Sequence, residues 1–114
     1  DSQAVFNDAG YNLMLGDGYF RRMLEYYNGS YPLAVAAYNA GPGNVTRWLR
    51  SNGDPRTGAV DWIEWVERIP LPETRNYVQR VLENAVVYEA MYPNRAIYKG
   101  ANPLSFFLGK RYPG

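Results

Sequence analysis

The stretch Ala36-Ala37-Tyr38-Asn39-Ala40-Gly41-Pro42-Gly43, residues 36–43, decides the fold, because an almost wholly apolar segment ends in it at a glycine-proline-glycine turn. Residues 33–40 carry few polar side chains, which is typical of a helix that is surrounded by other helices. Ser30 can cap this helix, and Pro32 suits its first turn. We therefore expect a central helix that begins after Ser30 and ends at residues 41–43.

An amphipathic helix is expected before the central one, over residues 8–28. Its apolar positions recur at a spacing close to that of an α-helical turn. They are Leu13, Phe20, Met23, Leu24 and Tyr27. Gly16 continues this stripe, so it is expected on the buried face, where a glycine lets a neighbouring helix approach closely. Gly29 supplies the stop signal.

Three more helices are expected after the turn, over residues 44–51, 62–69 and 72–92. Asp61 can cap the second of them, and Pro72 can begin the third. The apolar stripe of the third helix consists of Tyr77, Val78, Val81, Leu82, Ala85, Tyr88 and Tyr92. Residues 53–59 carry the Gly, Asp, Pro and Thr of an exposed loop. Because no alternating apolar pattern of useful length occurs, we predict an all-α fold.

The length of 114 residues fits one domain, which we expect over residues 1–93. Residues 94–114 are expected to form an irregular tail packed on it by Tyr98, Phe106 and Phe107.

The composition excludes several classes of function. The net charge is +1 with scattered Lys and Arg, so nucleic acid is not an expected partner. The chain has no His and no Cys, which excludes imidazole bases, thiol nucleophiles and His or thiolate zinc sites, and we expect neither a metal nor a cofactor. No apolar run is long enough to span a bilayer. The eleven tyrosines suit a wet groove that binds sugars, although many of them are expected at the edge of the core.

Three motifs in the same order resemble the soluble lytic murein transglycosylases and their goose-type lysozyme-like relatives. The first is the sequence quoted above with Val45 and Trp48-Leu49 after it. The second is Ile69-Pro70 followed by Glu73-Thr74-Arg75-Asn76-Tyr77-Val78. The third is Asn12 with Leu15-Gly16 and Tyr19-Phe20. The resemblance covers residues 7–92 and implies a lysozyme-like helical domain.

The resemblance also implies an activity. Members of that family cleave the β-1,4 bond between N-acetylmuramic acid and N-acetylglucosamine in peptidoglycan without consuming water, and they yield 1,6-anhydromuramic products. One glutamic acid protonates the leaving oxygen and then, as a carboxylate, takes the proton of the C6 hydroxyl. A periplasmic or cell-envelope location, with glycan strands as the partner, is implied in the same way.

The sequence departs from the family pattern at the general acid. In the family this acid stands in a Glu-Ser pair upstream of the first helix, and no Glu-Ser pair occurs between Asp1 and Gly114. We therefore expect the N-terminal segment of the domain to be missing here and the glutamate to lie upstream, on the same or a separate chain. Alternatives are a non-catalytic remnant that binds peptidoglycan and a helical interaction domain.

The family pattern assigns roles to individual residues. Tyr38 matches a tyrosine that orients the catalytic glutamate by a hydrogen bond, and its alternative is a core tyrosine with a satisfied hydroxyl. Asn39 is expected to contact an N-acetyl group or to hold the end of the helix. Ala40 and Gly41 are expected along the same groove, with Gly41 also serving the turn. Glu73 is expected either to line the substrate cleft or only to complement its helix dipole.

Tyr77, one turn after Glu73, is expected to reach the same cleft. Arg75 is expected to be a solvated charge rather than a ligand for a substrate carboxylate.

Overall fold

The computed structural model describes residues 8–92, and all regular structure within them is helical. This confirms the all-α prediction. The helices are α2 (Asp8–Gly16), α3 (Gly18–Tyr26), α4 (Tyr31–Ala40), α5 (Pro42–Asn52), α6 (Trp62–Glu67) and α7 (Pro72–Met91), with a short 3₁₀ turn, η1 (Pro55–Thr57). The expected tail over residues 94–114 lies outside the described residues.

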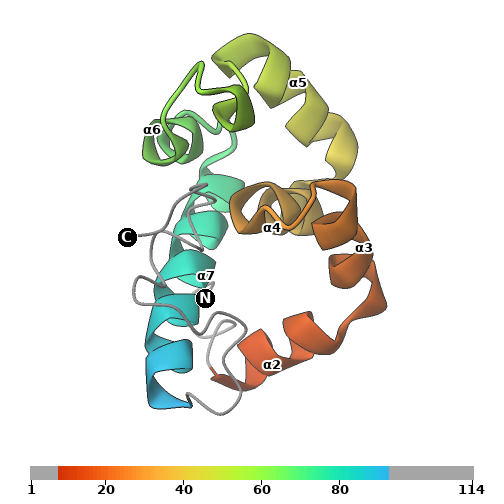
Figure 1. The fold of residues 1–114 in the computed structure, drawn as a ribbon, viewed down its shortest axis with the longest axis vertical. Helices are drawn as coiled ribbons and strands as arrows, with labels where there is room; N and C mark the ends of the chain where they lie inside the picture. Colours follow the sequence, from red (N-terminus) through yellow and green to blue (C-terminus); the bar gives the residue numbers. More distant parts are fainter. Residues whose placement is uncertain (1–7, 93–114) are drawn as a thin grey trace.

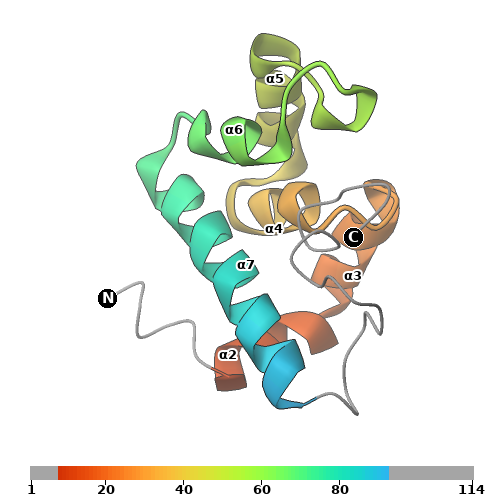
Figure 2. The ribbon, with the colours of Figure 1, turned by 60° about the vertical axis from the view of Figure 1, so that its left-hand side comes forward.

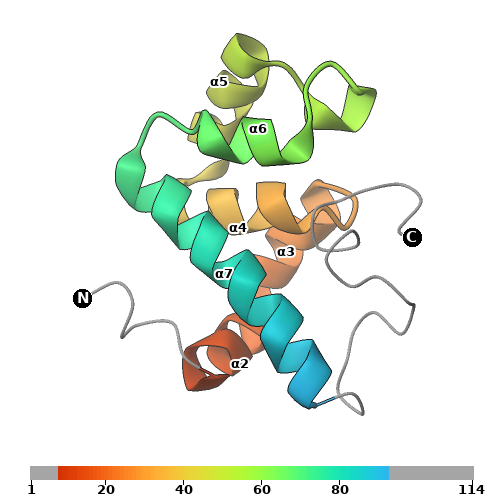
Figure 3. The ribbon, with the colours of Figure 1, turned by 90° about the vertical axis from the view of Figure 1, so that its left-hand side faces the viewer.

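Helix α4 lies at the centre of the described chain and packs against α3, α5 and α7 (Figure 1). Its residues Leu33 to Ala37 have no exposed surface, as a central helix requires. Helix α7 runs from the end that carries α6, past α4, to α2 at the opposite end (Figures 2 and 3). The core therefore lies around α4, and the ends of α3, α4 and α7 meet beside it.

The expected single helix over residues 8–28 is wrong, because the chain breaks at Asp17. Asp17 has an extended backbone, with φ of −77° and ψ of 125°, and its side chain accepts a hydrogen bond from the Tyr19 amide at 2.9 Å. An aspartate between two glycines is a good N-cap and a poor helix interior, so α3 starts anew after it.

The break also changes which face of α2 is buried. Leu13, expected in the core, is 76% exposed, whereas Tyr11 and Met14 are buried. Gly16 is exposed, with nothing within 4 Å of a Cβ placed on it, so the expected close helix approach there is wrong. The predicted stripe placed residues 13 and 20 on one continuous helix, and two separate helices do not keep that register.

The turn after α4 is shorter than expected. Gly41 alone separates α4 from α5, and Pro42 is the first residue of α5. Proline suits that position because the first helical amide has no partner within the helix. Residues 53–59 are confirmed as a connection, with η1 inside it.

The predicted caps and the last helix are confirmed. Ser30 accepts a hydrogen bond from the Leu33 amide, and Asp61 accepts one from the Ile63 amide. Helix α7 begins at Pro72. The most buried positions of its stripe are Val78, Val81, Leu82, Ala85 and Tyr88.

Within residues 8–92, no helix is long and apolar enough to cross a bilayer.

Candidate functional site

Tyr38 lies in the last turn of α4 with its ring half-buried and its hydroxyl at the surface. The ring stands edge-on to Phe20, with centroids 5.7 Å apart, and lies 6.0 Å from the ring of Tyr19. The hydroxyl donates a hydrogen bond to Oδ2 of Asp17 at 2.9 Å. Tyr38 is therefore not sealed in the helix bundle, and the break between α2 and α3 brings a carboxylate to it.

Asp17 and Tyr38 shift each other's pKa in opposite directions. The pKa of Asp17 is lowered by the hydrogen bond from the Tyr19 amide and then by the one from the Tyr38 hydroxyl. The pKa of Tyr38 is raised by burial and then by its hydrogen bond to Asp17. At neutral pH Asp17 is ionised and Tyr38 is protonated. Asp17 is consequently unsuited to donate a proton.

Tyr77 lies beside Tyr38, on the neighbouring helix α7. Burial raises the pKa of Tyr77 to about 12, and the nearby Tyr38 is the second cause of that rise. The structure thus places the two tyrosines near each other, and their contact with one substrate cleft stays a prediction.

Asn39 joins the end of α4 to the first turn of α7. Its Oδ1 accepts a hydrogen bond of 2.6 Å from Oγ1 of Thr74, which is only 2% exposed. The rest of Asn39 is exposed. Thr74 is the partner that sequence reasoning missed, and the roles expected of Asn39 at the groove stay predictions.

The other expected site residues lie around this junction. Glu73 is exposed and precedes Thr74 in the first turn of α7. Ala40 is half-buried, and Gly41 follows it with φ of 90°. Arg75 is half-buried and donates a hydrogen bond to the Ile69 carbonyl at 3.2 Å, so this side chain also contributes to the α6–α7 connection.

Asp17 itself is the site residue that sequence reasoning did not find. Its contact with Tyr38 spans 21 residues of sequence, and only the tertiary arrangement creates it. The available signal was local, because an aspartate flanked by two glycines is a cap sequence rather than a helix interior.

The arrangement has a defined hydrogen-bonding polarity. A phenol hydroxyl carries one proton, and Tyr38 uses it in the hydrogen bond to Asp17. The hydroxyl therefore presents only lone pairs to a further group. A partner must therefore donate, as a protonated carboxylic acid or a sugar hydroxyl does. Within residues 8–92, no three His, Cys, Asp or Glu side chains are grouped to hold a metal ion.

Sequence comparison identifies the family to which the chain with this site belongs. The family model described as the transglycosylase SLT domain matches residues 3–60, about half of the chain. The chain belongs to the transglycosylase SLT family. Within this SLT chain the matched segment contains Asp17, Tyr38 and Asn39, whereas Glu73 and Tyr77 lie after it.

Individual relatives support the same family assignment. The chain is 38% identical over 81 residues to the soluble lytic murein transglycosylase of Salmonella typhimurium and 37% identical over 81 residues to that of Escherichia coli K12. Each match covers 71% of this SLT chain and 11% of the relative. A putative soluble lytic murein transglycosylase of Haemophilus influenzae is 38% identical over 85 residues, which cover 71% of this chain and 12% of that protein. The chain thus spans about a tenth of the length of these relatives. No solved structure matches it significantly.

Proposed function

We propose that this chain forms the tyrosine-bearing side of the active site of a peptidoglycan lytic transglycosylase. The single observation that carries the proposal is the Tyr38 hydroxyl, which lies at the surface with its proton held by Asp17. A tyrosine sealed in the core would not present its hydroxyl to a further group. The murein transglycosylases among the relatives support the substrate class.

In the proposed reaction one carboxylic acid acts twice. It protonates the glycosidic oxygen as the bond from C1 of N-acetylmuramic acid to that oxygen breaks. The C6 hydroxyl oxygen of the same muramic sugar then bonds to C1, and its proton passes to the carboxylate. Because the acid regains its proton and no water is consumed, the product is a 1,6-anhydromuramic end.

The acid in this proposal is a glutamate on a segment upstream of Asp1, on the same or a separate chain. Asp17 does not serve, since its lowered pKa keeps it ionised. Tyr38 would accept a hydrogen bond from the protonated glutamate, which favours the neutral form of that acid. Tyr38 is thus a positioning residue, and Asp17 sets the direction of its hydrogen bond.

The substrate contacts in this proposal lie where α4 and α7 meet. Asn39, Ala40 and Gly41 would follow the glycan strand along the end of α4, and Glu73 and Tyr77 would contact it from α7. A periplasmic or cell-envelope location follows from a peptidoglycan substrate.

The test is muropeptide analysis of cell-wall sacculi incubated with the complete domain, meaning this chain together with its upstream segment. We expect 1,6-anhydromuropeptides from the complete domain and none from this chain alone. Tyr38→Phe should lower the rate by about 10- to 100-fold, because a correctly oriented acid contributes about 100-fold or more. Retention on sacculi should change little.

Tyr88→Phe is the matched control. Tyr88 also donates its hydroxyl proton to a side chain, Oδ1 of Asn12, at 2.7 Å, but between α7 and α2. Loss of the Tyr88 hydroxyl should leave the rate within about twofold of the rate of the unaltered domain. Sacculus binding without anhydro products from the complete domain would instead support the peptidoglycan-binding remnant, and absence of both would support the helical interaction domain.

A further inference from the structure

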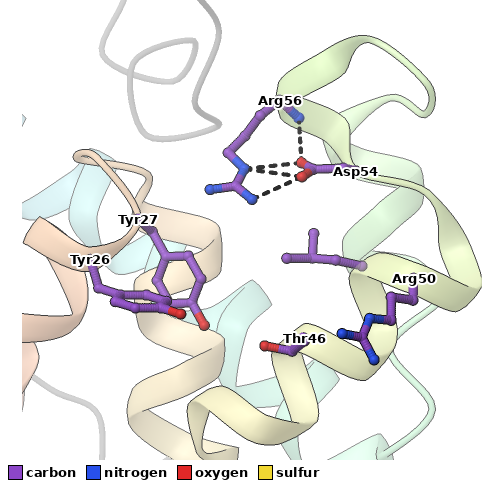
Figure 4. A pocket seen from close by; sticks show the side chains of 7 residues that line it. Tyr26, Tyr27, Thr46, Arg50, Asp54 and Arg56 are labelled. Carbon is purple, nitrogen blue, oxygen red and sulfur yellow. Dashed lines mark hydrogen bonds and ion pairs between the residues drawn. The ribbon is translucent and has the colours of Figure 1, made fainter.

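A cavity of about 400 Å³ lies between the C-terminal end of α3, helix α5 and the η1 turn (Figure 4). It shares no residue with the Tyr38 site. Its polar lining consists of Tyr26, Tyr27, Thr46, Arg50, Asp54 and Arg56, and Leu49 adds an apolar wall. The volume falls at the lower end of the range of small-ligand sites.

The phenol of Tyr27 is the unusual group in this cavity. Tyr27 is only 2% exposed, and its hydroxyl has no hydrogen-bond partner among the described residues. Figure 4 shows the hydroxyls of Tyr26 and Tyr27 directed across the cavity toward Thr46. A buried hydroxyl without a partner is unfavourable, and a ligand in the cavity that accepts a hydrogen bond from Tyr27 would remove that cost.

The charges of the lining favour a single negative group. Arg56 is held by Asp54 through a two-pronged contact, with Nη2 at 2.8 Å from Oδ2 and Nε at 3.0 Å from Oδ1. Arg50 forms no ion pair with any residue between 8 and 92. Two arginines and one aspartate leave a net charge of +1, and that charge resides on Arg50.

The remaining lining defines what surrounds the negative group. Arg50 follows Thr46 by four residues on α5, so the two side chains lie on one face of the helix. The Thr46 hydroxyl donates to the Pro42 carbonyl at 3.0 Å and can still accept a hydrogen bond. The Tyr26 side chain is 66% exposed and stands perpendicular to the Tyr27 ring, which offers an open aromatic face.

We propose that this cavity is a second binding site that takes a small carboxylate attached to a sugar ring or to the end of a short peptide. Arg50 binds the carboxylate as a planar fork, and the Tyr27 hydroxyl donates to it. The open face of Tyr26 covers the apolar side of the ligand. The inference does not depend on lytic activity, because binding alone tests it.

The experiment is an NMR titration of the chain with three probes, which are N-acetylmuramic acid, D-alanyl-D-alanine and the uncharged N-acetylglucosamine. At least one carboxylate probe should shift the amide signals of residues 46–56, and N-acetylglucosamine should bind at least about tenfold more weakly than that probe. Binding of the sugar acid alone assigns a sugar source, and binding of the dipeptide alone assigns a peptide end. Binding of neither, or equal binding of N-acetylglucosamine, would overturn the proposal.

Two variants locate the site. Arg50→Gln should raise the Kd by about tenfold or more, whereas Arg47→Gln, on the same helix but outside the cavity lining, should leave it within about twofold. Tyr27→Phe should weaken binding several-fold while the melting temperature stays the same or rises, since it removes an unpartnered hydroxyl. Equal effects of the two arginine variants, or unchanged binding by Tyr27→Phe, would contradict this site.

Discussion

The hydrogen bond from Tyr38 to Asp17 decides what chemistry its hydroxyl can support. The proton stays on the Tyr38 hydroxyl and points toward the ionised carboxylate of Asp17, since Asp17 has a lowered pKa and Tyr38 a raised one. A lone pair facing outward repels another carboxylate and attracts a carboxylic acid or a hydroxyl. Under the proposed function, Tyr38 would therefore face a protonated general acid, the form of the glutamate that protonates the leaving oxygen.

A pH dependence follows from Tyr27 and Tyr77. Burial raises the pKa of each to about 12. A phenol with a raised pKa keeps its proton in the folded state where the unfolded chain has already lost it, so folding binds protons between about pH 10 and 12. The stability that these phenols contribute is complete below about pH 10 and is lost as the pH rises toward 12. Urea unfolding at several pH values from about 9 to 11 should show this decline.

Single replacements assign the decline to its residues. Tyr27→Phe and Tyr77→Phe should each reduce the slope of the free energy of unfolding against pH above about pH 10, because each removes one proton-binding difference. A slope that neither replacement changes would show that these phenols titrate alike in the folded and unfolded states.

At the scale of elements, the junction between α4 and α5 depends on one glycine. Gly41 has φ of 90° and ψ of 148°, a conformation that only glycine adopts without strain. Gly43 lies inside α5, and a Cβ there would meet nothing within 4 Å. Gly41→Ala should lower the free energy of unfolding by about 1–3 kcal/mol. Gly43→Ala should raise it by up to about 1 kcal/mol, because alanine is the better helix residue.

Urea unfolding of these two variants is a matched comparison, since each adds one methyl group two residues from the other. If Gly41→Ala were as stable as Gly43→Ala, the glycine-only conformation at the end of α4 would not be needed to bring α5 back against it.

Elements with local signals could be predicted from sequence, and those set by tertiary contacts could not. Ser30, Asp61 and Pro72 begin their helices as expected, because a cap or a first-turn proline acts within a few residues. The break at Asp17 was missed because the apolar spacing continued across it. Because the break was not predicted, the contact between Asp17 and Tyr38 could not be predicted either.

The candidate site shows the same division. The resemblance predicted that Tyr38 and Tyr77 line one cleft, and the structure places the two tyrosines near each other on α4 and α7. It did not reveal that Thr74 would hold Asn39, because that bond joins residues 35 apart and depends on how α7 crosses α4. The cavity beside Tyr27 was also unpredicted, since three separate elements form it.

At the scale of the whole molecule, α4 holds the site because three helices pack on it at once. Its small side chains permit this, since Ala34, Ala36 and Ala37 have no exposed surface while α3, α5 and α7 contact the helix. Tyr38 and Asn39 extend from the end of this same helix toward Asp17 and Thr74. The packing of α4 therefore fixes the positions of both site contacts.

This dependence gives a prediction for the core. Ala34→Leu adds three carbon atoms at a position with no exposed surface. It should therefore push the neighbouring helices outward and lower the free energy of unfolding by about 1–3 kcal/mol. Ala90→Leu, at an exposed position of α7, is the same change without the crowding and should stay within about 0.5 kcal/mol. Urea unfolding measures both. An Ala34→Leu chain as stable as the unaltered one would mean that α4 is loosely packed, and the distances between Tyr38 and Asp17 and between Asn39 and Thr74 would then not be fixed by the fold.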